Sequence, residues 1–352
     1  MSQMKSFFLL IALLILSGCG NQFDRTRILD NAADNLIIPA YEDFKDKSDS
    51  LHIALMAFTE NPTEGMLQTA QERWKASIKS WKRAELYNFG PVESMVLVTS
   101  IDRWPTSEAG IETVIEEYDD SDDYLVRVGS NRRGLPAIEY LLFHSQPEEI
   151  ITEFEDANRK AYLLQLSASV AENSALILDE WQNEYKHRFI EKTGNRPNSG
   201  ITLLANEMGY LLEMIRMDKL EIPFGKQTMG ALRLHMLESE YAGISKQLIR
   251  ENLESARHTF NGGEGTGFDD YLDGLNIRGD DGMMLSEAIN QEYANALAII
   301  DNMDGSLAEV MQNDKEAVEQ LIESVQQLYI YTEVDMISQL NILDTFSDND
   351  GD

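Results

Sequence analysis

Helical spacing of apolar residues is the feature that most limits how this chain can fold. Apolar side chains recur three and four residues apart along most of the sequence, and only eight prolines occur in its 352 residues. Such spacing places apolar residues on one face of a helix, and the alternation typical of half-buried strands is hard to find. We therefore expect an all-α fold of two helical-bundle domains.

The periodicity predicts the helices individually. We expect them at about 27–61, 63–86, 111–117, 136–144, 152–189, 201–218, 226–261, 283–302 and 315–337. On the helix expected at 152–189, one apolar stripe would consist of Leu164, Ala168, Ala171, Ala175 and Leu178. Residues 194–200 form the richest turn cluster, so we place the domain boundary there, with an N-terminal bundle at 27–195 and a C-terminal bundle at 196–345.

The first residues indicate export. Lys5 precedes an apolar run at 7–16, which is about half of the roughly 20 residues that span a bilayer, and Ser17-Gly18-Cys19 follows. This layout is typical of a bacterial lipoprotein signal, with a signal peptide at 1–18 and a lipid anchor and linker at 19–26. The alternative is a short buried helix with an incidental cysteine. Because no Asp occurs at residues 20 and 21, we expect a periplasm-facing outer-membrane location in the cell envelope.

Cysteine usage and charge exclude several classes of function. Cys19 is the only cysteine, so the chain contains no internal disulfide or thiolate metal cluster, and Cys19 is the expected lipid attachment site. With 29 Lys and Arg against 61 Asp and Glu, the net charge of -32 repels nucleic acid. An acidic surface is compatible with cationic ligands, and equally with simple solubility beside a membrane.

Carboxylates on apolar helix faces are the residues that could carry chemistry. The five histidines show no pairing at three- or four-residue spacing, which excludes a histidine-rich zinc site on one helix. Glu85 follows Trp74, Ile78 and Trp81 on one stripe. Glu139 interrupts an apolar helix that we expect to begin at Pro136, so it would lie in the first turn.

Two interpretations of Glu139 stay open at this point. It could be a ligand-binding carboxylate, or it could cap free helix amides or pair with Arg132 or Arg133.

The chain also resembles a known family over nearly its whole length. Seven segments in order carry the resemblance: Trp81–Glu85, Phe89–Pro91, Ile101–Pro105, Gly134–Phe143, Lys219–Gly225, Glu238–Ser245 and Gly267–Leu272. The acidic end at 345–352 is similar to that of some members. Together these segments resemble the imelysin family, which is also classified among the peptidases.

The resemblance implies two helical bundles with a site between them, built around the motif GxHxxE. Members are exported, often as lipoproteins, and are associated with iron uptake and iron-regulated expression. In this sequence Gly134 and Glu139 match the motif, but Pro136 stands at the histidine position. Proline offers no ligand, so a zinc peptidase mechanism is disfavoured, and oxygen ligands would favour harder cations.

The resulting hypothesis is a lipid-anchored binding protein that takes iron or another divalent cation at the domain interface. The binding candidates are Glu139, Glu85, Asp102, Arg103, Glu238, Ser239 and Tyr241. Two alternatives remain, namely a metallopeptidase with Glu139 as general base and an interaction protein that lacks the ancestral site. The expected partners are the membrane, through lipid on Cys19, and iron-acquisition proteins, with no nucleic acid. Residues 346–352 are expected to be a solvated acidic tail, since no Glu completes a calcium loop there.

Overall fold

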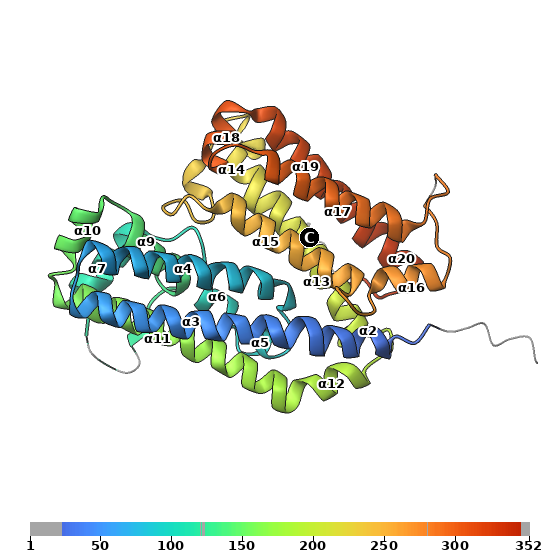
Figure 1. The fold of residues 1–352 in the computed structure, drawn as a ribbon, viewed down its shortest axis with the longest axis horizontal. Helices are drawn as coiled ribbons and strands as arrows, with labels where there is room; N and C mark the ends of the chain where they lie inside the picture. Colours follow the sequence, from blue (N-terminus) through green and yellow to red (C-terminus); the bar gives the residue numbers. More distant parts are fainter. Residues whose placement is uncertain (1–22, 120, 122–123, 280, 346–352) are drawn as a thin grey trace, which may run out of the picture.

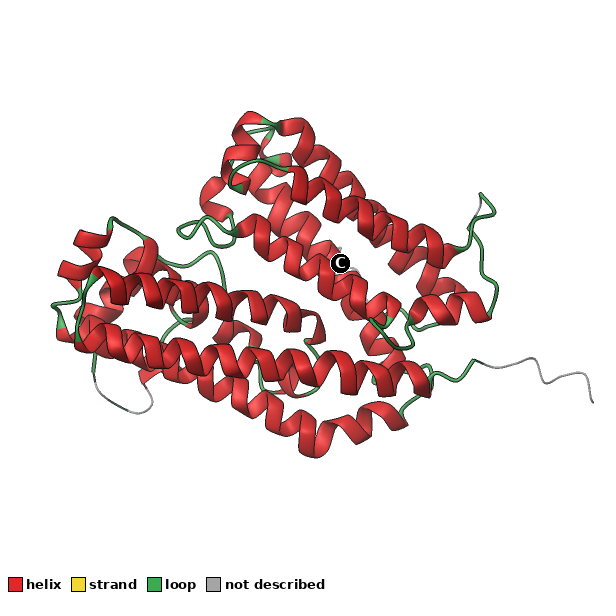
Figure 2. Cartoon of the chain, in the orientation of Figure 1, coloured by secondary structure: helices red, strands yellow, loops and turns green. Residues whose placement is uncertain are grey.

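The described residues of the computed structural model are all helix, turn and loop, as the sequence predicted (Figures 1 and 2). The structure describes residues 23–119, 121, 124–279 and 281–345. Within these ranges the one extended pairing is an isolated bridge between Arg278 and Met284. The predicted signal peptide, Cys19 and the acidic tail at 346–352 lie outside the described residues.

The first bundle is built around long helices α3, α4 and α11, with α9 packed on α4 and α11 (Figure 1). A continuous rod is formed by α2 (Thr26–Asn31), the π-helical segment η1 (Ala32–Ile37) and α3 (Ile38–Glu60). Helix α4 spans Glu64–Ala84, and its N-cap Thr63 accepts a hydrogen bond from the Met66 amide. A second rod contains α11 (Ala157–Glu180), the π-helical η4 (Trp181–Tyr185) and α12 (Lys186–Glu191).

The second bundle is built from α13, α15, α17 and α19 (Figure 1). Helix α13 (Gly200–Met214) continues through the π-helical η5 (Ile215–Glu221) into α14 (Ile222–Phe224). Helix α15 spans Ser245–Asn261 and α17 spans Leu285–Asn302. Helix α19 (Lys315–Tyr329) continues through the π-helical η8 (Ile330–Met336) into α20 (Ile337–Gln339).

Short helices connect these rods. They are η2 (Glu85–Tyr87), α5 (Pro91–Ser94), α6 (Val98–Ile101), α7 (Glu108–Glu116), α8 (Tyr124–Arg127), η3 (Ser130–Arg132), α9 (Gly134–Phe143), α10 (Pro147–Glu153), η6 (Lys226–Thr228), η7 (Leu234–Met236), α16 (Phe268–Gly274) and α18 (Leu307–Asn313).

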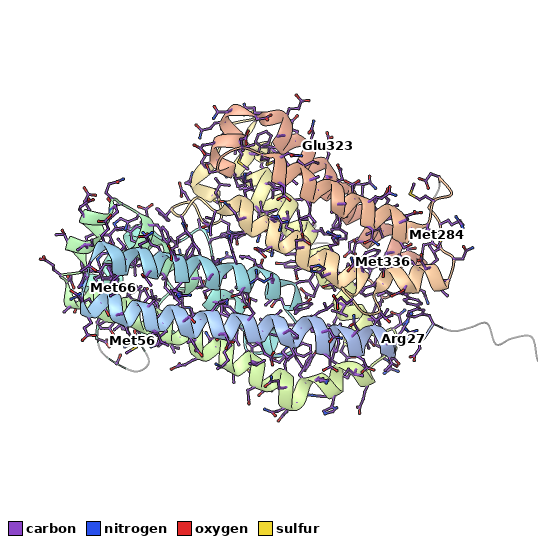
Figure 3. The ribbon with its side chains drawn as sticks, viewed as in Figure 1. Arg27, Met56, Met66, Met284, Glu323 and Met336 are labelled. Carbon is purple, nitrogen blue, oxygen red and sulfur yellow. The ribbon has the colours of Figure 1, made fainter. Side chains whose placement is uncertain are left out.

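One continuous core runs through both bundles. Helix α15 of the second bundle packs on α4 of the first, and α13 packs on η2. Met336 is buried within the second bundle, whereas Met56 and Met66 are exposed in the first bundle, away from the second (Figure 3). Buried apolar residues form a single cluster that runs from Ile28 in α2 to Ile342, just after α20.

Three details of the helix prediction were wrong. The helix expected at 226–261 begins only at Ser245, because Gly225, Gly230 and Gly243 all have positive φ, which breaks the helix repeatedly. The segment expected at 152–189 is divided, with α11 starting after its N-cap Asp156. The buried face of α11 also lies beside the expected stripe, and includes Leu163, Leu166, Ser167, Val170, Ser174 and Ile177.

Candidate functional site

Helix α9 positions the motif residues. Gly134 has φ +77°, and a Cβ there would lie 2.3 Å from the Ile101 carbonyl oxygen, so only glycine fits this close approach. The helix begins at Gly134, two residues earlier than expected, which places Pro136 third and moves Glu139 into the second turn. Pro136 and Glu139 are buried and lie three residues apart on one face.

Glu139 holds a distant loop rather than its own helix end. Its Oε1 accepts hydrogen bonds from Ser239 Oγ at 3.0 Å and from the Ala242 amide at 2.8 Å. Arg133 instead donates to the Leu125 carbonyl at 3.1 Å. Ser239 has φ +57°, a conformation that is uncommon outside glycine, and its bond to Glu139 helps to hold it there. Among the described residues, Glu139 therefore neither caps its own helix nor pairs with Arg132 or Arg133.

Among the residues that the structure describes, no positive side chain pairs with the buried Glu139 carboxyl. Only 4% of the residue is exposed. Burial raises the pKa of Glu139 to about 8, and the negative charges of Glu238 and Asp102 add to this effect, although the bonds from Ala242 and Ser239 oppose it. At neutral pH the carboxyl is consequently mostly protonated.

A small cavity of about 190 Å³ lies against Glu139. Pro136 and Trp104 contribute to its wall, and the exposed residues at its mouth include Glu108, His235 and Glu240. Tyr241, which also lines the cavity, donates a hydrogen bond from its hydroxyl to Glu108 Oε1 at 2.6 Å. The cavity thus combines carboxylates, a phenol and an imidazole, which are groups that bind transition metals.

Three other carboxylates converge beside this cavity, but a lysine lies among them. Oxygens of Glu85, Asp102 and Glu238 lie within 4.8 Å of one another, an arrangement that could hold a metal ion. Lys82 Nζ lies 2.7 Å from Glu85 Oε1 and 2.5 Å from Glu238 Oε1, and it also donates to Asp102. The side chain of Lys82 is only 1% exposed. We call these four residues, together with Lys219 and Asn252, the buried ion cluster.

Lys219 and Asn252 complete the cluster from the second bundle. Lys219 Nζ lies 3.2 Å from Glu85 Oε2, 3.0 Å from Glu238 Oε2 and 2.7 Å from Asn252 Oδ1. Asn252 Nδ2 donates to Glu85 Oε2 at 2.8 Å and to the Lys82 carbonyl at 2.9 Å. Lys82, Lys219, Glu238 and Asn252 are buried and the Glu85 side chain is 11% exposed, so the stability of these charges depends on their mutual pairing.

The carboxylates of the cluster keep Lys82 charged. Burial by itself would lower the pKa of Lys82, but Asp102, Glu238 and Glu85 outweigh burial and raise the pKa well above its usual value. Burial would raise the pKa of Glu85, yet Lys219 and Lys82 lower it to about 2. The pKa of Asp102 is raised, because burial exceeds the effect of Lys82. With ammonium groups among the carboxylates, this donor set does not fit a divalent cation.

The sequence-predicted residues therefore divide into two neighbouring groups. Glu85, Asp102 and Glu238 belong to the buried ion cluster, whereas Glu139, Ser239 and Tyr241 line the small cavity. Arg103 joins neither group, since it is exposed and its charge acts on Asp218.

Sequence reasoning missed Lys82, Lys219, Asn252 and His235. A signal existed for Lys82, which precedes Glu85 by three residues and so faces it on the same helix side.

Comparisons with known proteins agree with this architecture. The family model described as Imelysin matches residues 37–331. The chain belongs to the imelysin family. Iron-regulated protein A of Synechococcus elongatus is 25% identical over 174 residues, which are 48% of this chain and 44% of that protein. This chain thus aligns with less than half of the length of that relative.

Two solved structures share the fold of this imelysin-family chain. An imelysin-like protein from Psychrobacter arcticum has a TM-score of 0.75 at 20% identity, covering 91% of this chain and 98% of its own. An iron-regulated protein A precursor from Parabacteroides distasonis has a TM-score of 0.76 at 18% identity, covering 92% and 97%. Among the described residues, no helix combines the length and apolar character that crossing a bilayer requires.

Proposed function

We propose that this imelysin-family chain is an iron-related binding protein of the cell envelope that takes a cation in the cavity against Glu139. One observation carries the proposal: Glu139 is a buried carboxyl facing a cavity, and its neighbouring charges, Glu238 and Asp102, are negative. A cation in the cavity would supply the missing positive charge. Binding would then displace the proton from Glu139.

The names of relatives support iron as the cation. One relative of known sequence and one of known structure are both called iron-regulated protein A. Carboxylate, phenol and imidazole groups such as those of Glu139, Tyr241 and His235 suit iron, whereas the buried ion cluster is already neutralised by lysines. A peptidase mechanism has less support, since Pro136 supplies no metal ligand.

Titration calorimetry with anaerobic iron(II) and with zinc tests the cation proposal. The variants are Pro136→His, Glu139→Gln and the double variant, with folding of each checked by circular dichroism. Because residues 136 and 139 lie on one face, Pro136→His should tighten zinc binding by at least about tenfold, and Glu139→Gln should remove the gain. Equal binding by all four proteins, or no binding by any, would show that Glu139 is a structural residue.

Incubating the protein with a panel of peptides, with and without a chelator, tests the alternative that it is a metallopeptidase. Chelator-sensitive hydrolysis that is lost in Glu139→Gln would support a metallopeptidase instead of a binding protein.

We also propose that the chain is anchored through lipid on Cys19, as its signal-like first residues indicate. Cys19→Ser should abolish labelling by radioactive fatty acid and leave uncleaved precursor, because no other thiol is present. Labelling of the variant at the native level would contradict the anchor.

A further inference from the structure

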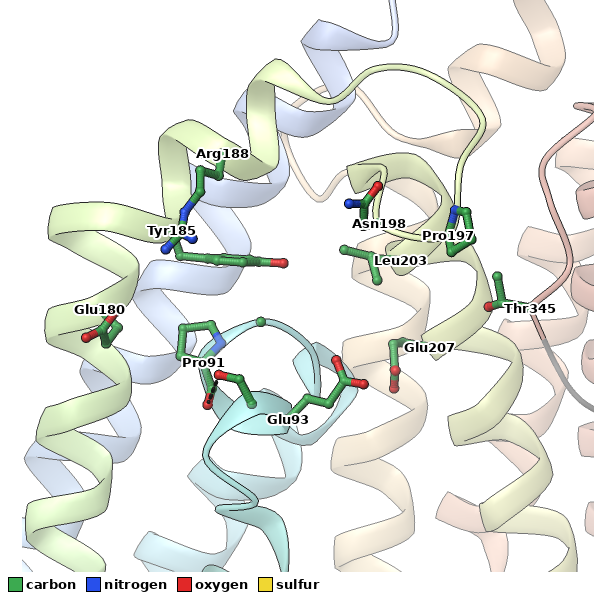
Figure 4. Close-up of a pocket in the computed structure, with 12 residues that line it drawn as sticks. Pro91, Glu93, Glu180, Tyr185, Arg188, Pro197, Asn198, Leu203, Glu207 and Thr345 are labelled. Carbon is green, nitrogen blue, oxygen red and sulfur yellow. Dashed lines mark hydrogen bonds between the residues drawn. The ribbon is translucent and has the colours of Figure 1, made fainter.

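A second and larger cavity of about 600 Å³ lies between α5, the rod of α11 and η4, and α13 (Figure 4). Its walls are partly apolar, with contributions from Pro91, Pro197 and Leu203. Oxygen-bearing side chains also line it, among them Glu93, Tyr185 and Glu207, and Arg188 is the one positively charged side chain among its lining residues. A volume of this size is typical of sites for small organic ligands.

Tyr185 is fixed in place with its hydroxyl directed into this cavity. Its ring lies against Gly90, where a Cβ would come within 2.4 Å of Tyr185 Cζ, and its centroid is 4.9 Å from that of Trp181. Figure 4 shows the hydroxyl pointing across the cavity toward α13. Among the described residues, the hydroxyl has no hydrogen-bond partner. Burial raises the pKa of Tyr185 to about 12, so the phenol stays neutral.

Glu93 on α5 and Glu207 on α13 approach each other across the cavity (Figure 4). Neither carboxylate forms a hydrogen bond or ion pair with another described residue. Burial, together with the charge of Glu93, raises the pKa of Glu207 to about 8. Arg188 does not neutralise them, because its guanidinium lies 5.7 Å from the Tyr185 ring centroid and pairs with Glu184 at 3.5 Å.

We propose that this cavity binds an organic ammonium ion, with the ammonium group between Glu93 and Glu207 and its carbon chain against the apolar side chains of Pro91, Pro197 and Leu203. Glu93 attracts positive charge, a bound ammonium would displace the proton from Glu207, and the unpartnered Tyr185 hydroxyl can accept a hydrogen bond from it. A bare metal ion fits less well, since calcium requires six to eight oxygens at about 2.3–2.6 Å, whereas the oxygen-bearing side chains here are spread over the walls of a cavity of about 600 Å³. The site is separate from Glu139 and does not depend on the function proposed above.

Calorimetric titration of 1,5-diaminopentane into the full chain, in phosphate buffer at physiological ionic strength, tests the proposal. The native protein should bind at millimolar concentration or better, and Glu207→Gln should weaken binding by at least about tenfold, the loss expected for one charged contact. Glu191→Gln, which removes the same charge from an exposed position on α12 outside the cavity, should bind like the native protein. This control matters because a net charge of -32 attracts diamines non-specifically.

Several results would overturn the proposal. They include no binding by the native protein, equal weakening in Glu191→Gln and Glu207→Gln, and binding of calcium at this site without binding of the diamine. Replacing the diamine with 1,5-pentanediol tests the role of charge, and equal binding of the diol would also contradict it. Iron binding at Glu139 is measured independently, so failure here leaves the function proposed above untouched.

Discussion

Replacing Lys82 with methionine tests the buried ion cluster most directly, because it removes the central cation and keeps a side chain of similar length. Lys82 contacts the carboxylates of Glu85, Asp102 and Glu238. Lys219, the cation that remains in the variant, contacts only Glu85 and Glu238. Breaking a buried ion pair costs about 3–5 kcal/mol. Since three carboxylates lose one shared cation, we expect Lys82→Met to lower the free energy of unfolding by about 5 kcal/mol.

Urea denaturation at pH 7 measures this loss. Lys45→Met is the matched control, because Lys45 pairs with Asp49 at 2.7 Å on the surface, with side chains 33% and 45% exposed. Such exposed pairs contribute about 0–1 kcal/mol. The cost of Lys82→Met should shrink in acid, where the abandoned carboxylates become protonated. If the two variants lose equal stability, the cluster does not hold the fold as described.

The same variant should also create a metal site. Without the ammonium group, the oxygens of Glu85, Asp102 and Glu238 remain within 4.8 Å of one another. A divalent ion that binds only the folded state adds about 2.7 kcal/mol at one hundred times its Kd. Manganese should therefore stabilise Lys82→Met but not Lys82→Met/Glu85→Gln. Absence of this rescue would show that Lys82 does not occupy a potential metal position.

Two further predictions concern Glu139 and Gly90. The pKa of Glu139 is raised from 4.5 to about 8 in the folded chain, so the stability that its protonation contributes is present below pH 4.5 and is lost as pH rises to 8. Glu139→Gln removes this titration. Between pH 4.5 and 8, the free energy of unfolding should therefore fall less in the variant than in the native chain, by up to about 4–5 kcal/mol. An equal fall in both proteins would contradict the raised pKa. Gly90→Ala should destabilise by about 1–3 kcal/mol in urea, because φ is +63° and the added Cβ meets the Tyr185 ring; wild-type stability would refute that packing.

The helical architecture could be predicted because it follows from local spacing. Trp74, Ile78 and Trp81 lie on one stripe of α4 and are each at most 2% exposed, as their three- and four-residue spacing indicates. The same stripe correctly placed Glu85 near the core. Where the helix prediction failed, at 226–244, apolar spacing continued while positive φ at Gly225, Gly230 and Gly243 prevented a helix.

The cluster itself could not be predicted in the same way, because it depends on contacts between distant residues. Lys219 meets Glu85 across 134 positions, and Glu139 meets Ser239 across 100. A lysine in a helix is usually exposed, and only the convergence of three carboxylates makes the burial of Lys82 favourable. Such convergence is a property of the packed fold rather than of any local pattern.

The buried ion cluster also constrains how relatives of this chain can diverge. Lys82, Glu85 and Asp102 come from the first bundle, whereas Lys219 and Glu238 come from later in the chain, and each ammonium contacts carboxylates of both origins. A change at one position leaves an uncompensated charge that a second change within the set, in either part of the chain, has to correct. These positions should therefore covary as a set across the family, and recombination that joins halves from distant relatives should yield unstable chimeras unless the set is inherited together.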